Sequence, residues 1–243
     1  MNASPSEWDS ACLDLDIVQI RFDDVESYSG EAREAAAAAE YVLAKVPMGN
    51  VRLLHELEQE GYRFLATQIS IVLDIDDRPE PPLFVQSLAR RIDARPLADG
   101  QLEELLSKID ADMVDTDRVS LDPALGRDLA LHRHRAWVRD EYADPRNVLR
   151  GLFLGADLVG FFLLGHVTAE HYFASLAGVF SRYKGSGLGV AAIWKPIEWA
   201  EQNGVKRLTT RNSSNNPDSL KTHLALGYRV ERLEYILRLH RGD

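Results

Sequence analysis

The feature that most constrains this chain is a run of alternating glycines between an apolar segment and a helical one. Gly185, Gly187 and Gly189 follow the apolar segment Tyr172–Phe180, and a helical pattern then runs to Gly204. Glycine adopts backbone conformations that other residues avoid, so the chain can turn sharply here and expose successive N–H groups. At the start of a helix, such groups act with the helix dipole to bind an anion. The pattern predicts a strand, a turn that cradles a pyrophosphate, and a helix; a flexible turn without a ligand is the alternative.

Two other glycine patterns that bind nucleotides do not fit this turn. The dinucleotide pattern G-x-G-x-x-G needs a third glycine where this chain has Val190. The pattern G-x-x-x-x-G-K-[ST] of nucleoside triphosphatases is absent from the sequence. A dinucleotide or a nucleoside triphosphate is therefore disfavoured as the ligand.

Composition and charge exclude several classes of protein. With 243 residues, 45% of them hydrophobic, the chain can bury a core and form one large or two small domains. Its formal net charge of −10 disfavours a nucleic-acid partner. Cys12 is the single cysteine and cannot form an internal disulfide, which suits a reducing compartment. The longest apolar run, Leu158–Gly165, is too short to span a membrane, and the N-terminus has no signal pattern. We therefore expect a cytoplasmic protein without a membrane partner.

A proline-rich stretch, Asp76–Pro82, divides the sequence. It holds three prolines and four charges and no periodic apolar positions, which is typical of a linker. It predicts a small N-terminal α+β domain over residues 1–80 and a larger domain over residues 83–243. The apolar periodicity predicts strands over 13–20, 41–46, 83–94, 148–154, 158–164, 172–180, 205–210 and 228–239, with a further strand containing Ile69 and Ile75, and helices over 31–40, 50–61 and 217–226 and around Leu105 and Leu129.

The two halves share a short repeat. In Asn50–Arg63 and in Asn216–Arg229, an asparagine precedes Gly-Tyr-Arg by the same number of residues. Both segments predict an Asn-capped helix that ends at a glycine and is followed by a strand. Duplication and chance recurrence both explain the match. If the chain is duplicated, the first copy lacks the glycine turn and has Leu57 where the second has His223, so only the second copy is chemically equipped.

Two motifs resemble signatures of the GNAT acetyltransferase superfamily. The segment Tyr183–Gly189 resembles its acyl-CoA loop, R/Q-x-x-G-x-G/A, with Lys184 at the Arg/Gln position and Gly187 and Gly189 as the two small residues. A second signature, an asparagine followed by a short helix that ends in a glycine–aromatic pair, resembles the segment from Asn216 to Tyr228. The resemblance covers about residues 120–240.

The resemblance implies a fold and an activity. The fold is α/β (α+β): a GNAT-like domain with a mixed, mostly antiparallel central sheet flanked by helices, preceded by a smaller, degenerate GNAT-like α+β domain. The activity is N-acetyl transfer from acetyl-CoA, as co-substrate, to a primary amine within a ternary complex. The residues that this resemblance assigns to acetyl-CoA binding are Val179, Lys184, Gly185, Ser186, Gly187, Leu188, Gly189 and Asn216.

Catalytic residues can be carried over with one departure. The usual acid of the family is a tyrosine at the position of His223, so we expect His223 to protonate the departing thiolate; water, or a packed histidine without this role, is the alternative. Glu170 and His171, at the start of the strand that enters the glycine turn, are candidate bases or simply an exposed strand start. Asn212 and Ser213 either hydrogen-bond the acceptor or the pantetheine arm, or cap a loop.

The acceptor is suggested by a narrower resemblance, to nucleotide-sugar N-acetyltransferases of the dTDP-fucosamine type. It is carried by Asp218–His223 and Tyr235–Leu237. It implies a nucleotide-linked amino sugar as the acceptor. Another small amine, such as an antibiotic or an amino acid, and a catalytically silent acyl-CoA-binding module are the alternatives. A homodimer is compatible with the sequence.

One predicted helix carries several basic residues. Arg133, Arg135 and Arg139 either contact the diphosphate of such an acceptor or form a solvated helix face. His132 and His134 are two residues apart, so on a helix their imidazoles point to different faces. We therefore expect no metal site.

Overall fold

The computed structural model describes residues 2–23 and 28–242. Its strands are β1 (Asn2–Pro5), β2 (Ile17–Arg21), β3 (Tyr41–Pro47), β4 (Arg63–Asp74), β5 (Asp93–Arg95), β6 (Val148–Leu154), β7 (Asp157–Thr168), β8 (His171–Val179), β9 (Arg207–Ser213) and β10 (Arg229–His240). Its α-helices are α1 (Glu7–Leu13), α2 (Gly30–Ala38), α3 (Val51–Gln59), α4 (Leu83–Ala89), α5 (Gln101–Lys108), α6 (Arg118–Leu121), α7 (Gly126–Ala143), α8 (Leu188–Gln202) and α9 (Pro217–Ala225). Short 3₁₀ turns are η1 (Ile75–Asp77), η2 (Ala111–Met113) and η3 (Ser181–Tyr183).

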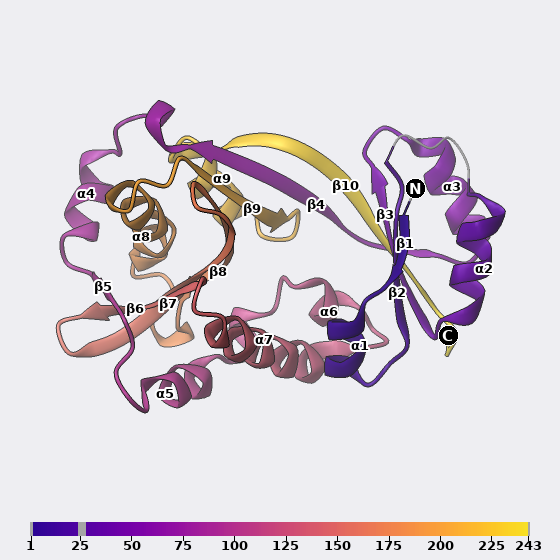
Figure 1. The fold of residues 1–243 in the computed structure, drawn as a ribbon, viewed down its shortest axis with the longest axis horizontal. Coiled ribbons are helices and arrows are strands. Elements are labelled where there is room, and N and C mark those ends of the chain that lie inside the picture. The colour runs from indigo at the N-terminus through magenta and orange to yellow at the C-terminus, as the bar shows by residue number, and fades with distance from the viewer. Residues whose placement is uncertain (1, 24–27, 243) are drawn as a thin grey trace.

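All these strands form one sheet, in the order β1-β2-β3-β10-β4-β9-β8-β7-β6-β5 (Figure 1). The pairs β2–β3 and β8–β9 are parallel, and the other neighbouring pairs are antiparallel. Helices cover the sheet on both faces. This confirms the predicted fold class, a mixed and mostly antiparallel sheet flanked by helices.

The two halves of the chain are interleaved in this sheet. The order of elements β1, β2, α2, β3, α3, β4 recurs as β7, β8, α8, β9, α9, β10. Each series has an antiparallel pair followed by a parallel pair, and its last strand lies beside the last strand of the other series. As a result, β10 pairs with β3 and β4 pairs with β9. The repeat found in the sequence therefore extends to six elements in each half.

The repeated segments have the same local structure. The side chain of Asn50 accepts a hydrogen bond from a backbone N–H in the first turn of α3 at 3.2 Å, and that of Asn216 does so for α9 at 3.2 Å. Gly61 and Gly227 follow the two helices with φ of +93° and +97°. Only glycine adopts this conformation without strain, so it ends each helix and redirects the chain into the next strand.

Two of the predicted strands are wrong in whole or in part. Residues 83–94 form α4 and the short strand β5, because Val85 and Ala89, one helical turn apart, are buried in the cluster that also holds part of α8. The strand predicted over 13–20 begins only at Ile17, since α1 runs to Leu13 and Asp14 has a left-handed φ of 53°. Residues 78–82 belong to no helix or strand. The sheet runs across this point, and separate folding of residues 1–80 and 83–243 stays a prediction.

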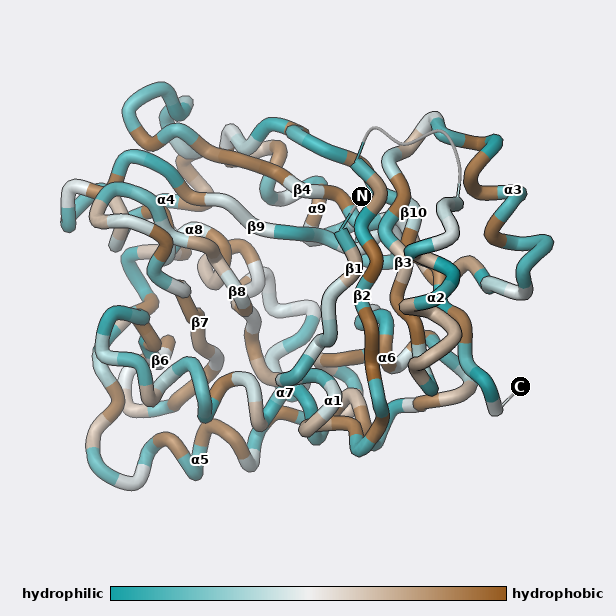
Figure 2. Tube along the Cα trace, turned by 45° about the vertical axis from the view of Figure 1, so that its right-hand side comes forward, coloured by the Kyte–Doolittle hydropathy of each residue, from teal (hydrophilic) through white to brown (hydrophobic). Residues whose placement is uncertain are grey.

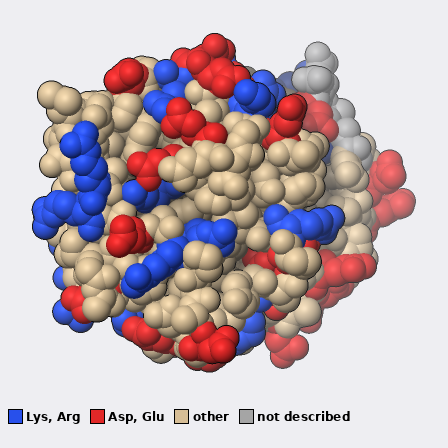
Figure 3. Space-filling model, turned by 60° about the vertical axis from the view of Figure 1, so that its left-hand side comes forward, with Lys and Arg blue, Asp and Glu red and all other residues tan. Residues whose placement is uncertain are grey.

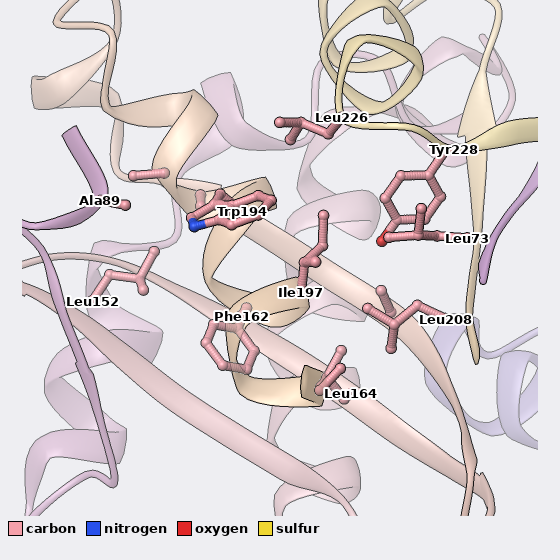
Figure 4. Packing of buried hydrophobic residues seen from close by; sticks show 14 of the residues in the cluster. Leu73, Ala89, Leu152, Phe162, Leu164, Trp194, Ile197, Leu208, Leu226 and Tyr228 are labelled. Carbon is pink, nitrogen blue, oxygen red and sulfur yellow. The ribbon is translucent and has the colours of Figure 1, made fainter. Parts of the chain in front are cut away.

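One face of the sheet carries α8 at one end and α2 and α3 at the other. Trp194 and Ile197 of α8 pack against Phe162 and Leu164 of β7 and against Leu208 of β9 (Figure 4). At the other end, the clustered apolar side chains of α2 and α3 pack on β2, β3 and β10. The strands β2 and β4 are largely apolar, whereas β9 is mostly hydrophilic (Figure 2). A polar strand in the middle of a sheet indicates that part of it faces a water-accessible space.

The opposite face is covered by α5 and α7 over β6 and β7, and by α1 and α6 over β3 and β10. One buried carboxylate joins the helices to the strands here. Asp122, which follows α6, is 0% exposed; the hydroxyl of Tyr41 donates to its Oδ2 at 2.7 Å, and Nε of Arg238 lies 3.3 Å from its Oδ1. No helix in the described part of the chain is long and apolar enough to cross a membrane.

The Asp122 contacts predict a large loss of stability on substitution. We expect Asp122→Ala to lower the free energy of unfolding by about 3–5 kcal/mol, because it removes the buried carboxylate that faces the Arg238 guanidinium. Tyr41→Phe removes a single hydrogen bond and should cost about 1–2 kcal/mol. Urea denaturation of both variants measures the difference. Equal, small losses would show that this ion pair is not important for stability.

Candidate functional site

The parallel strands β8 and β9 form a fork. They pair only over His171–Phe173 and Arg207–Thr209. The hydroxyl of Thr210 then donates to the carbonyl oxygen of Ala174 at 2.7 Å, and beyond this bond the strands separate. In β8, Ser175 is an extra residue between the two residues that pair with β7 on either side of it, a β-bulge. A bulge bends its strand, so it directs β8 away from β9.

A cavity of about 450 Å³ occupies this opening. Its walls include residues of β8 and β9, His223 and Tyr228 at and after α9, and Trp137 of α7. Because α9 and α7 lie on opposite faces of the sheet, the cavity passes through the sheet between the separated strands. On the α7 side, its floor is formed by β3, β4 and β10.

The glycine turn follows β8 after the short 3₁₀ turn η3. Gly185 and Gly187 have φ of +76° and +81°, in the left-handed region that favours glycine. Ser186 holds the turn together: its hydroxyl donates to the carbonyl oxygen of Tyr183 at 2.6 Å and accepts from the N–H of Leu188 at 3.3 Å. The helix α8 begins at Leu188.

The turn presents unused N–H groups to open space. Among the described residues, no acceptor bonds the N–H groups of Gly185, Gly187 or Gly189. A Cβ atom added at Gly185 or Gly189 would meet no atom within 4 Å. Acidic and basic side chains are interspersed over the molecular face in Figure 3. Attraction for an anion at the turn therefore has to come from local groups such as these N–H groups. The turn and the α8 N-terminus fit a pyrophosphate.

Three other residues predicted to bind acetyl-CoA have different surroundings. The ammonium group of Lys184 donates to the carbonyl oxygen of Asp112 in η2 and lies 3.9 Å from the Asp115 carboxylate. Leu188 is buried in the core with 4% exposure, so its side chain does not face the turn's open side. Val179 is partly buried at the end of β8. Their contacts with the co-substrate stay predictions.

His223 lies on α9 and lines the cavity. Its Nδ1 is 2.8 Å from the carbonyl oxygen of Ser219, which can only accept, so Nδ1 carries the hydrogen and Nε2 is an acceptor in the neutral ring. Burial lowers the pKa of His223, although the bond to Ser219 opposes this. The ring contacts Tyr228 edge-on, with centroids 4.9 Å apart. A neutral ring whose Nε2 carries no hydrogen cannot donate a proton from that atom, which weighs against the predicted acid role. No observation tests the role directly, and it stays a prediction.

Glu170 and His171 lie at the closed end of the fork. The carbonyl oxygen of Glu170 accepts from the N–H groups of Lys206 and Arg207, and Nε2 of His171 is 2.8 Å from the hydroxyl of Thr209. Neither residue lines the cavity. Their positions give no support to the predicted role as base, which stays a prediction.

Asn212 and Asn216 lie beside the fork. Asn212 on β9 is buried, and its Oδ1 accepts from the hydroxyl of Ser219 at 2.8 Å. Its Nδ2 has no hydrogen-bond partner in the described structure. Both asparagines and Ser213 line the cavity, and Asn216 also caps α9. The unpaired Nδ2 donor favours a role for Asn212 in binding over the capping alternative.

The arginines of α7 are held by the protein. Nε of Arg133 donates to Asp9 at 2.7 Å, and Arg135 donates to the carbonyl oxygen of Ile109 at 2.7 Å. Arg139 donates to Glu103 at 3.2 Å. These contacts do not favour diphosphate binding. Arg133 is 8% exposed, so it is not part of a solvated helix face either.

No group of three His, Cys, Asp or Glu side chains suited to a metal ion occurs in the described residues.

Three basic residues of the cavity, Lys45, Arg118 and Arg211, were not predicted from the sequence. Lys45 is 6% exposed on β3, and its signal was a charged residue inside the apolar strand segment Tyr41–Val46. Burial, and next the positive charge of Arg211, lower the pKa of Lys45 to about 7. Arg211 had no local signal, because its position depends on the fork.

Comparison with known proteins identifies this arrangement. Residues 114–228 match the family model described as acetyltransferase (GNAT) family. A search of curated proteins gave no match.

Solved structures share the fold. A GCN5-related N-acetyltransferase from Sphaerobacter thermophilus has a TM-score of 0.58 and 17% identity, over 82% of this chain and 59% of that chain. One from Kribbella flavida has a TM-score of 0.55 and 15% identity, over 92% and 80%. A tandem GNAT protein from the clavulanic acid biosynthesis pathway has a TM-score of 0.53 and 14% identity, over 88% and 68%. This chain thus spans only 59% of the length of the Sphaerobacter protein. The fork, the glycine turn and α9 all lie in residues 114–228, the segment that matches the acetyltransferase (GNAT) family model.

Proposed function

We propose that this protein transfers an acetyl group from acetyl-CoA to a primary amine, with both substrates bound together. The observation that carries the proposal is the fork of β8 and β9 leading to the glycine turn. Past Ala174, the edge of β8 that faces β9 has no strand partner. An extended pantetheine arm with its amide groups can hydrogen-bond to such an edge, as an added strand does. The pyrophosphate then lies at the turn and the thioester reaches the cavity.

The chemistry is attack of a neutral amine on the thioester carbon: a C–N bond forms, the C–S bond breaks, and the sulfur leaves as a thiolate. The protein's part is to hold both reactants in place and to exclude water. Nε2 of a neutral His223 suits accepting a hydrogen bond at the cavity wall. We therefore propose that the thiolate takes its proton from water or from the attacking amine, and not from His223.

The first half of the chain supports the proposal of a degenerate second unit. One of the similar structures is a tandem GNAT protein. Here β2 and β3 stay paired over Ile17–Arg21 and Tyr41–Lys45, so no comparable fork opens between them. Within the described residues, the first unit therefore offers no gap between these strands for a second pantetheine arm. We also propose that the protein is cytoplasmic, because its single cysteine, Cys12, cannot form an internal disulfide and suits a reducing compartment.

For the acceptor, we retain a nucleotide-linked amino sugar, on the resemblance carried by α9 and β10. The closed contacts of the α7 arginines favour, as a second candidate, a smaller amine that does not reach them. The histidine at position 223 favours a third, a silent acyl-CoA-binding module. Release of CoA thiol with a panel of amines separates the three: the acceptor that is turned over identifies its class, and binding without turnover identifies the module.

Replacing Gly189 tests the binding of acetyl-CoA. We expect acetyl-CoA at a hundredfold excess over its Kd to stabilise the wild type by about 2.7 kcal/mol, a melting shift of several degrees. Gly189→Asp should abolish this shift, because a carboxylate then occupies the open space at the turn and repels the pyrophosphate. The same carboxylate at a helix N-terminus should leave the unliganded protein equally or more stable.

Gly189→Ala is the matched control, since it adds only a methyl group and no charge. It should keep more of the acetyl-CoA shift than Gly189→Asp does. A full shift in Gly189→Asp would show that acetyl-CoA does not use this turn.

The lowered pKa of His223 predicts a pH-dependent stability. Above about pH 6.5 the ring is neutral in both the folded and the unfolded chain. As the pH falls below this value, the unfolded chain binds the proton more readily, so the folded state loses stability until the lowered pKa of His223 is passed. Thermal unfolding between about pH 7.5 and about pH 5.5 should show a smaller loss for His223→Gln than for the wild type. The exposed His55→Gln is the control. Identical pH profiles for His223→Gln and wild type would contradict the burial effect.

A further inference from the structure

Two cationic side chains in the cavity have no counter-ion. Lys45 and Arg211 both line it, and neither charged group forms a hydrogen bond or ion pair with any residue in the described ranges. Lys45 is 6% exposed, whereas Arg211 is open to the cavity and lies over the Phe173 ring at 5.2 Å. A buried ammonium group without a partner is costly, so such a lysine loses its proton more easily unless an anion is close by.

Both side chains point to the face of the sheet that carries α6 and α7. Lys45 alternates along β3 with residues of the α2–α3 cluster and shares the side of Leu43, which packs with α1 and α6. Arg211 is opposite Ser70 on β4, and its neighbours Thr210 and Asn212 point to the other face. The two cations therefore meet on one side of the fork, away from α8 and α9.

Two of the nearby carboxylates are already paired with other cations. Glu234, 1% exposed on β10, has Nε of Arg232 at 3.3 Å and Nε of Arg21 at 3.7 Å from its Oε1. Its Oε2 accepts from the amide of Gln68 at 2.9 Å. Glu234 also attracts Lys45 and Arg211, but with two arginines already facing it, this single carboxylate does not balance all of these positive charges.

The second carboxylate beside the cavity, Asp9, is matched in the same way. It pairs with Arg118 at 3.0 Å and with Arg133 at 2.7 Å. A third carboxylate, Asp117, also lines the cavity; its Oδ1 accepts from the N–H of Val119 at 2.9 Å, and it forms no ion pair within the described residues. The surroundings are still positive on balance, because four basic side chains and only two acidic ones line the cavity: Lys45, Arg118, Arg133 and Arg211 against Asp9 and Asp117. Burial, and then the charges of Arg211, Arg21 and Arg118, lower the pKa of Lys45.

An anion that entered the cavity would remove this imbalance. It would supply hydrogen-bond acceptors to the ammonium group of Lys45 and to the guanidinium group of Arg211, and it would offset the repulsion between these two groups. Since Arg211 is next to Thr210, where β8 and β9 part, an anion bound there lies directly beside the fork. The rest of the same molecule can then extend into the fork.

We propose that Lys45 and Arg211 bind an acidic group, a carboxylate or a phosphate, of the amine acceptor. This inference rests on the proposed acetyl transfer and narrows its substrate class. Amino acids, sugar phosphates and nucleotide-linked amino sugars fit, whereas polyamines and other polycations do not. The anion fixes one end of the acceptor on the α7 side of the sheet and leaves its amine free to approach the thioester.

A first experiment tests the anion site without any activity. In the Gly189→Asp background, where the glycine turn is blocked, we measure melting with inorganic phosphate and with acetate against sodium chloride of equal ionic strength. We expect stabilisation by one or both anions, and an apparent anion Kd at least about tenfold weaker after adding Lys45→Met or Arg211→Met. The comparison of the melting shifts with phosphate and with acetate shows whether the site prefers a phosphate or a carboxylate.

The matched control is Lys221→Met, which removes an exposed lysine of α9 with 77% side-chain exposure. Lys45→Met should fold well, because it replaces an unpaired buried charge by an apolar chain of similar length. Unchanged anion binding in Lys45→Met and Arg211→Met, or no anion binding before these changes, would overturn the inference.

A second experiment tests the acceptor class in the wild type. Acetyl transfer is compared for glucosamine and glucosamine 6-phosphate, and for β-alaninamide and β-alanine. We expect kcat/KM to favour one acidic member over its neutral partner at least about tenfold, and Lys45→Met to remove the preference while the acetyl-CoA melting shift is kept. Equal use of the acidic and neutral partners would overturn the inference. If acetyl-CoA neither binds nor reacts, the proposed function fails, and the first experiment still decides on the anion site.

Discussion

The site depends on the point at which β8 and β9 stop pairing. A parallel ladder would normally continue to the strand ends, but the bulge at Ser175 bends β8 away after Phe173 and Thr209. This leaves backbone groups of β8 unpaired inside the molecule, where such groups need a partner. It also sets the direction in which β8 delivers the glycine turn to the start of α8. The unpaired strand edge and the glycine turn thus follow one another, as the proposed binding of a long ligand with a pyrophosphate requires.

Interleaving of the two halves explains why the first half is kept although it has no fork. Because β10 lies between β3 and β4, residues of the first half form the floor of the cavity in the second half. Lys45 comes from β3 and Gln68 from β4, and the buried Glu234 lies opposite Gln68 on β10. A unit without such an opening therefore supplies the wall on which we place the acceptor. The sheet makes the two units one site, whatever their origin.

Local chemistry made some of these features predictable. The alternating glycines predicted the turn, and Asn216 and Gly227 predicted the ends of α9, because each acts on its own stretch of backbone. Glu170 and His171 were chosen because they precede the turn in sequence, but the fork opens at the other end of β8. His223 lines the cavity, but the predicted acid role depends on its charge, which burial and not the local sequence determines. Arg211 could not be identified as a cavity residue, because its position depends on the pairing of β9 with β4, which the sequence of neither strand predicts alone.

The charge of the whole protein and the charge of its cavity have opposite signs, and this affects how an anion can be recognised. A net charge of −10 repels an anionic acceptor at long range, so the surface does not steer it inward. Attraction arises only after the acceptor has entered the cavity, where Lys45 is buried. Salt screens buried charges much less than exposed ones. Recognition of the acidic group therefore depends on fit within the cavity and little on ionic strength, which makes it a source of specificity more than of association rate.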